Sequence, residues 1–143
     1  MNRRLFYQLS RAQRALTRAA DAELRGSLDV TAVQLGALFA LAERDGIVLT
    51  ELGDTLALAN SAVSGLADRL ERDGLAERRP DPDDGRAFRL HLTDRGREVA
   101  AAAQPALARF NQRVEAGFTA AELDLVARYL STLTDRFKEN DND

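Results

Sequence analysis

Small polar side chains and arginines that suit contacts with nucleic acid are concentrated between residues 60 and 86. Asn60, Ser61 and Ser64 carry amide and hydroxyl groups, which can hydrogen-bond base edges or phosphate oxygens. Arg69 and Arg72 follow them, and the planar guanidinium group matches the geometry of phosphate and of guanine. The segment therefore has the residue types of a surface that contacts DNA.

Residues 60–73 fit an amphipathic helix that would present these side chains on one face. At 100° per residue, an apolar stripe is formed by Val63, Leu66, Ala67 and Leu70. The opposite face, which is small near its N-terminal end, carries Ser61, Ser64, Gly65, Asp68 and Arg72. Ala62 adds a methyl group of the kind that contacts thymine. Such a helix can lie close against a groove.

The flanking segments give this helix a context. Thr50 can cap a short helix that has Leu52 and Leu56 on one face. About two residues separate this short helix from the 60–73 helix, which predicts a sharp turn between the two helices. After Gly74 the apolar period changes to 2 in residues 75–79 and 86–92, and a turn-forming cluster at 80–85 separates the two strands. Helix, turn, helix and hairpin together predict a winged helix-turn-helix.

The rest of the chain is predicted to be helical, so the expected fold is mainly α with a small β-wing. Capping boxes at Thr31 and Thr119 begin two helices, Thr93 can cap another, and residues 3–25 form a long amphipathic helix. Residues 47–49 suit a third short strand. We expect one domain over 1–143, with a winged lobe at 28–93 and an all-helical lobe from 1–27 and 94–143. The apolar stripes of the terminal helices have no partner of their own. They could pack against the winged lobe in a monomer, but we expect them to interlace with the same helices of a second chain in a two-fold dimer.

Composition argues against an enzyme and against a bound metal or cofactor. The chain has no cysteine nucleophile, no glycine-rich phosphate loop, and a single histidine without a neighbouring metal-ligand pattern; Ser61 and Ser64 have no base near them in the sequence. No apolar stretch approaches the roughly 18 residues needed to span a membrane. The N-terminus lacks the apolar core of a signal peptide, and we expect a cytoplasmic protein.

The string from Thr50 to Thr93 resembles the MarR family of bacterial transcriptional regulators, with Asp84-x-Arg86 at the wing tip and 92–96 (LTDRG) closing it. Segments 30–34 and 118–123 extend the resemblance over nearly the whole chain. The resemblance implies a homodimer joined by its terminal helices on a palindromic DNA operator. It also implies that Arg86 reaches the minor groove and that Asp84 steadies it.

Family members are commonly released from DNA by small aromatic or phenolic ligands, which implies a repressor that responds to such a ligand. The residues expected to line its pocket are Phe6, Gln13, Phe39 and Phe110, although the three phenylalanines also suit a plain core. His91 could sense pH or contact a ligand. The simpler expectation is that it is a solvated residue of the strand without either function.

Three positions depart from the family pattern. Ala59 replaces a usual capping serine, and Asn60 and Gly65 stand at positions that are often basic. Asn60 could therefore pair with adenine or cap the helix. From Asn60 to Arg95 seven arginines face eight acidic residues, and the net charge of the chain is −3. These features leave an alternative open, in which the winged helix binds a protein partner or serves a ligand-sensing dimer with weakened DNA binding.

Overall fold

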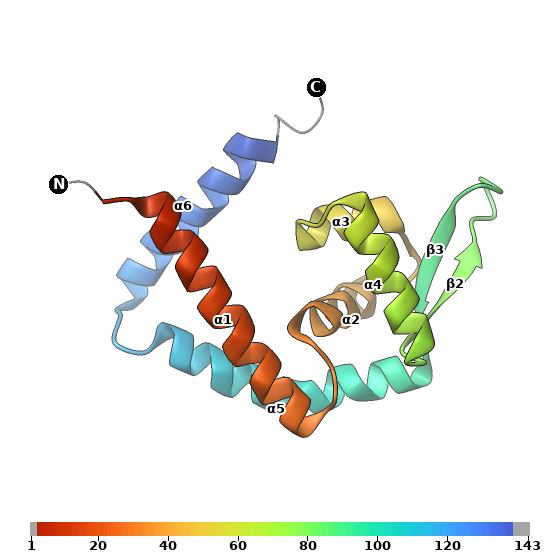
Figure 1. Ribbon diagram of the computed structural model, residues 1–143, viewed down its shortest axis with the longest axis horizontal. Coiled ribbons are helices and arrows are strands. Elements are labelled where there is room, and N and C mark those ends of the chain that lie inside the picture. The colour runs from red at the N-terminus through yellow and green to blue at the C-terminus, as the bar shows by residue number, and fades with distance from the viewer. Residues whose placement is uncertain (1–2, 139–143) are drawn as a thin grey trace. The chain divides into compact units, whose positions relative to one another are not determined.

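The computed structural model describes residues 3–138, and it confirms a mainly α fold with a small β-wing (Figure 1). The elements in chain order are α1 (Leu5–Ser27), α2 (Ala32–Glu43), β1 (Ile47–Val48), α3 (Leu49–Leu56), α4 (Asn60–Arg72), β2 (Ala76–Pro80), β3 (Phe88–Leu92), α5 (Asp94–Glu115) and α6 (Ala120–Lys138).

The chain divides into two compact units, Met1–Leu107 and Ala108–Asp143. The first contains the winged helix-turn-helix, α1 and the first part of α5, and the second contains the end of α5 and α6. The boundary falls shortly after Pro105, which lies inside α5. The functional division into a winged lobe at 28–93 and a helical lobe from both ends stays a prediction.

The predicted hairpin is present and carries the third strand that the sequence indicated. The sheet order is β1-β3-β2, and both neighbours of β3 are antiparallel to it. Ile47 and Arg78 are both register partners of Leu90, so the central strand is covered on each side. Leu49 belongs to α3 rather than to the strand.

One hydrophobic core holds α2, α3, α4 and the sheet together. The largest fully buried side chains in it are Leu38, Leu41, Leu52, Leu66, Leu70, Leu75, Leu90 and Val63. The apolar stripe predicted for α4 is buried as expected. Burying a leucine or valine side chain stabilises the folded state by about 1.5–3 kcal/mol, so this cluster dominates the stability of the first unit.

Most of the predicted helix starts are confirmed by hydrogen bonds. Both bonds of a capping box form between Thr31 and Gln34 and again between Thr119 and Glu122, and the Thr93 hydroxyl accepts the N–H of Gly96. The predicted cap at Thr50 is wrong. Helix α3 begins at Leu49, with Val48 at the capping position, because the chain enters it directly from β1.

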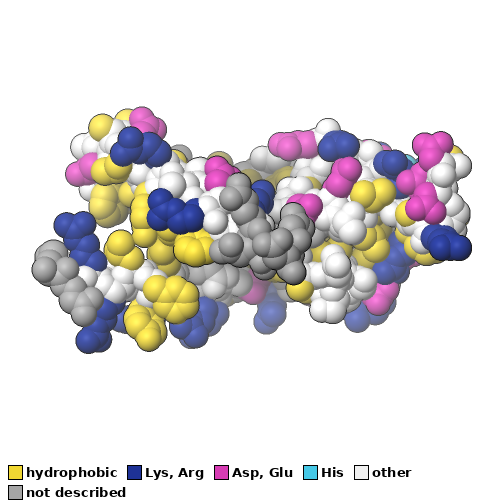
Figure 2. Space-filling view, turned by 90° about the horizontal axis from the view of Figure 1, so that it is seen from above, with side chains coloured by type: hydrophobic (Ala, Val, Ile, Leu, Met, Phe, Trp, Pro, Cys, Tyr) yellow, Lys and Arg dark blue, Asp and Glu magenta, His cyan; other side chains and the backbone are white. Residues whose placement is uncertain are grey.

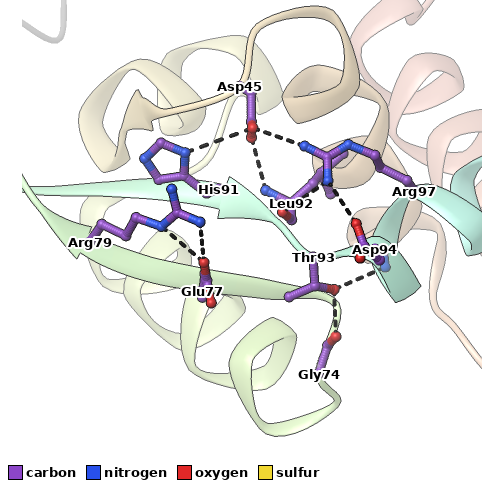
Figure 3. A network of polar contacts seen from close by, with 10 residues as sticks. Asp45, Gly74, Glu77, Arg79, His91, Leu92, Thr93, Asp94 and Arg97 are labelled. Atoms are coloured by element: carbon purple, nitrogen blue, oxygen red, sulfur yellow. Dashed lines mark hydrogen bonds and ion pairs between the residues drawn. The ribbon is translucent and has the colours of Figure 1, made fainter.

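Asp45 joins the base of the wing to α5 (Figure 3). One carboxylate oxygen accepts the Leu92 N–H at 2.9 Å, and the other lies 3.2 Å from Nη2 of Arg97 and 3.7 Å from Nδ1 of His91. His91 is therefore not a solvated strand residue. Its ring is mostly buried over Gly46, where an added Cβ would lie 2.8 Å from the ring.

Several apolar side chains of the terminal helices remain exposed. On α1 they include Leu5, Phe6, Tyr7 and Leu16, and α6 buries none of its residues. No single described helix is long and apolar enough to cross a membrane; α1 and α2 pass that test only together, as a pair bent by 79°.

Gly96 allows the first turn of α5 to pack against the backbone that leads into β2. A Cβ at this position would lie 2.1 Å from the carbonyl oxygen of Leu75, which cannot move without disturbing the start of the wing. We expect Gly96→Ala to lower the free energy of unfolding by about 3 kcal/mol, measured by urea denaturation. Gly26→Ala is the matched control, because nothing lies within 4 Å of a Cβ there. Equal stability of the two variants would contradict this packing.

Asp73 at the end of α4 makes stability depend on pH. The hydrogen bond from the Gln34 amide, with smaller help from Arg72 and Arg95, lowers the pKa of this carboxyl although partial burial opposes the shift. A lowered folded-state pKa contributes stability above the unfolded-state pKa, and this stability is lost as pH falls through the folded-state value. We expect Asp73→Asn to be less stable than wild type at neutral pH, with the difference shrinking as Asp73 protonates. A difference that stays constant from neutral pH to acid would contradict this role.

Candidate nucleic-acid interface

The position of α4 is set by its close approach to α3. A Cβ on Gly53 would lie 2.8 Å from Cγ2 of Val63 and 3.1 Å from the carbonyl oxygen of Leu58, so the two helices meet where one of them has no side chain. Between them the backbone of Ala57 is left-handed, with φ of 54°, and the Leu58 N–H donates to the Gly53 carbonyl at 2.9 Å. This tight turn directs the N-terminal end of α4 outward.

The outward face of α4 is small and polar, as predicted. Asn60, Ser61, Ala62 and Ser64 are all exposed, and Gly65 is partly covered. The alternative in which Asn60 caps the helix is wrong, because Ala59 occupies the capping position and no side chain caps this end. The Asn60 amide therefore remains available for a partner.

Arg69 lies along the helix over Gly65. Its Nη1 would be 3.5 Å from a Cβ at position 65, so the guanidinium occupies the space next to the missing side chain. Within residues 3–138 Arg69 makes no ion pair, whereas Nε of Arg72 lies 3.3 Å from Asp73. Of the two arginines that were predicted to contact phosphate, Arg69 has its charge free.

Three of the wing arginines are engaged internally. Arg78 bonds to Asp68 and Glu71 at 2.7 and 2.6 Å, Arg79 pairs with Glu77, and Nε of Arg89 lies 3.2 Å from the buried Asp81. Four acidic side chains of this segment are therefore paired with arginines, which lowers the amount of unpaired negative charge. On the face shown in Figure 2, basic and acidic side chains are accordingly interspersed.

Arg78 is the most enclosed of these arginines. Burial alone would lower its pKa, but the hydrogen bonds to Asp68 and Glu71 outweigh this effect and raise the pKa of the guanidinium. Its charge is thus permanent, and it is committed to α4.

The wing tip presents Arg86 on a braced turn. The Arg86 N–H donates to Oδ1 of Asp84 at 3.0 Å, the Ala87 N–H donates to the Asp84 carbonyl, and the Asp81 N–H donates to the Ala87 carbonyl. The Arg86 side chain is exposed and makes no ion pair among the described residues. Asp84 therefore steadies the backbone of Arg86 and leaves its guanidinium free. The two residues are joined by this backbone hydrogen bond and not by an ion pair between their side chains.

The four residues predicted to line a ligand pocket have separate surroundings. Phe6 is 75% exposed with its ring edge against Tyr7, Gln13 donates to Thr17, and Phe39 packs on the core. Phe110 is partly buried in the second unit. The pocket stays a prediction.

The contacts of Arg78 with α4 were not predicted from the sequence. The available signal was the spacing of Ser64, Asp68 and Glu71, which share one side of a helix, followed by an arginine on the next strand. The strand register that brings them together could not be read from the sequence.

Known proteins resemble this chain in sequence and in fold. A sequence model of the MarR family matches residues 28–87. The transcriptional activatory protein BadR of Rhodopseudomonas palustris is 30% identical over 144 residues, covering 97% of this chain and 81% of BadR.

Two solved structures from Streptomyces coelicolor are similar over most of the chain. The transcriptional regulator PcaV, in complex with its natural ligand, is 29% identical with a TM-score of 0.78, covering 92% of this chain and 89% of PcaV. Sco3205, a MarR family transcriptional regulator in complex with DNA, is 25% identical with a TM-score of 0.85, covering 92% of this chain and 84% of Sco3205.

Gly65 weakens α4 without a packing reason. A Cβ at this position would meet only Arg69, at an ordinary contact distance. We expect Gly65→Ala to raise the free energy of unfolding by up to about 1 kcal/mol, measured by urea denaturation, because alanine favours the helix. Gly53→Ala in the neighbouring helix is the control and should destabilise, because its Cβ would overlap Val63. A loss of stability in Gly65→Ala would show that the glycine is needed for packing.

Proposed function

Because the chain belongs to the MarR family of transcriptional regulators, we propose that it binds a palindromic operator as a homodimer and represses transcription until a small aromatic ligand releases it. It is a winged-helix DNA-binding regulator and not an enzyme. The single observation that carries the proposal is that two arginines of this interface, Arg69 on α4 and Arg86 at the wing tip, are exposed and form no ion pair within residues 3–138.

In the proposed mode of binding, the N-terminal half of α4 enters the major groove. Asn60 can pair with adenine, Ser61 and Ser64 can bond base edges or phosphates, and the Ala62 methyl can contact thymine. Gly65 brings the backbone close to the duplex, and Arg69 binds phosphate. Arg72 contributes at the far end of the helix only if it leaves Asp73.

The wing would follow the DNA backbone into the adjacent minor groove. Arg86 projects from a turn that Asp84 holds in place, so the backbone that carries it needs little ordering on binding. Narrow A·T-rich minor grooves have a strongly negative potential that attracts such an arginine.

Dimerisation is supported by apolar surface that is exposed on the terminal helices. Phe6 and Tyr7 on α1 and Val126 and Leu130 on α6 are exposed, and exposed apolar patches commonly mark protein interfaces. A two-fold dimer would offer two copies of α4 to half-sites that are roughly 34–36 Å apart.

Repression and release by a ligand complete the proposal. A protein on an operator that overlaps the promoter blocks transcription, and a ligand releases the protein only if it binds the non-DNA-binding state more tightly. PcaV was solved with its natural ligand, which supports a ligand for this chain, with Phe6, Gln13, Phe39 and Phe110 as the first residues to substitute. A reporter gene behind the operator distinguishes repression from the activation that the name of BadR describes.

The test is binding to a duplex taken from upstream of the protein's own gene, compared with a shuffled duplex at several salt concentrations. We expect tight, salt-dependent binding that favours the upstream duplex. Arg86→Ala should weaken binding about tenfold to a hundredfold and reduce the salt slope by about one, because one cationic contact is lost. Arg44→Ala, at the end of α2 in a pair with Glu51, is the control and should bind like wild type. Wild type that binds no duplex even at low salt would contradict the proposal.

A further inference from the structure

We propose that Arg78 is a positioning residue of the DNA interface, which holds Asp68 and Glu71 against the wing and so keeps two carboxylates from repelling DNA phosphates. This inference rests on the proposed function. The Arg78 clamp is defined here as Arg78 with the side chains of Asp68 and Glu71 and the main-chain carbonyl of Ser64.

The clamp joins two elements that would enter different grooves. Arg78 lies on β2 opposite Leu90, on the same face of the sheet as the buried Ala76. This face packs against α4, which stands beside the hairpin in Figure 1. Nη1 of Arg78 bonds to both carboxylates, and its Nη2 donates to the Ser64 carbonyl at 3.3 Å.

The carboxylates lie on the part of α4 that leads to the DNA-facing residues. Ser64, Asp68 and Glu71 follow one another at helical spacing, so they form one stripe along α4. Asp68 is one turn, about 5.4 Å along the axis, from Ser64. If Ser64 meets the major groove, an uncompensated charge at Asp68 would approach the phosphates that border it.

Arg78 itself is poorly placed to bind phosphate. Its side chain is 23% exposed and both terminal nitrogens are engaged, whereas the Asp68 side chain is 70% exposed. Like charges brought together at an interface oppose binding strongly. The expected function of Arg78 is therefore exerted through the two acids and through the orientation of α4, not by direct contact.

This assignment also explains how an acidic recognition surface can bind DNA. One guanidinium bonds two carboxylates of the segment and so reduces their combined charge from −2 to −1. Arg79, the next residue on the strand, points to the other face, and among residues 3–138 its ion pair is with Glu77. It provides a matched comparison of equal charge.

The experiment measures binding of the upstream and shuffled duplexes at several salt concentrations by fluorescence anisotropy. Four proteins are compared: wild type, Arg78→Gln, Arg79→Gln, and the triple variant Asp68→Asn/Glu71→Gln/Arg78→Gln, in which the whole clamp is neutral. Circular dichroism and thermal unfolding confirm that each variant is folded.

We expect Arg78→Gln to weaken binding of the upstream duplex about tenfold or more, and the triple variant to recover to within about threefold of wild type. The salt slope of Arg78→Gln should stay within about half a unit of wild type, because no phosphate contact is removed. Arg79→Gln should change affinity less than Arg78→Gln.

Two results would overturn the inference. A salt slope reduced by about one in Arg78→Gln, with no recovery in the triple variant, would make Arg78 a direct phosphate ligand. Equal effects of Arg78→Gln and Arg79→Gln would remove any special role. If wild type binds neither duplex, the proposed function itself fails, so that outcome is separated from a failure of the clamp alone.

Discussion

The contact between Gly53 and Val63 is the constraint on which the interface depends. Only a residue without a side chain lets α3 approach α4 this closely, and the turn through Ala57 and Leu58 is built on the same glycine. Because α4 is held by this contact on one side and by the leucine core beneath it, its small polar face has one orientation. A larger side chain at position 53 would hold α3 and α4 further apart.

The pairing of charged side chains determines the electrostatic surface more than the net charge of the chain does. The chain is acidic overall, yet four acids near the interface, Asp68, Glu71, Glu77 and Asp81, are paired with Arg78, Arg79 and Arg89. An exposed pair such as Arg79 with Glu77 contributes little to stability, about 0–1 kcal/mol. The larger consequence of these pairs is for the electrostatic surface, because Arg69 and Arg86 are left with uncompensated positive charge at two separate places. The net charge of the sequence therefore underestimates the ability of this surface to bind an anionic partner such as DNA.

Much of the fold could be predicted because local patterns agree with the tertiary structure. The stripe on α4 and the capping boxes at Thr31 and Thr119 are local, and each formed as its spacing indicated. The change of apolar period after Gly74 indicated the wing, and the family resemblance agreed with it. The start of α3 was misplaced because a two-residue strand leads directly into it, which removes the usual loop before a helix cap.

The candidate site was harder to predict because its pairings span different elements. That His91 is covered by Gly46 and Asp45, and that Arg78 reaches back to Asp68, depends on strand register and on turn geometry. Residue type and helical spacing do not determine either feature. Asp84 was expected to steady Arg86, and it does so through the backbone, because its carboxylate accepts the Arg86 N–H.

In the proposed complex, α4 occupies the major groove while the wing tip occupies the adjacent minor groove. Dimethyl sulfate footprinting distinguishes the two grooves directly, because the reagent methylates guanine at N7 in the major groove and adenine at N3 in the minor groove. We expect two clusters of N7 protection about one helical turn apart, each flanked by protection at adenine N3. Protection confined to one groove, or none on a duplex that the protein binds, would contradict it.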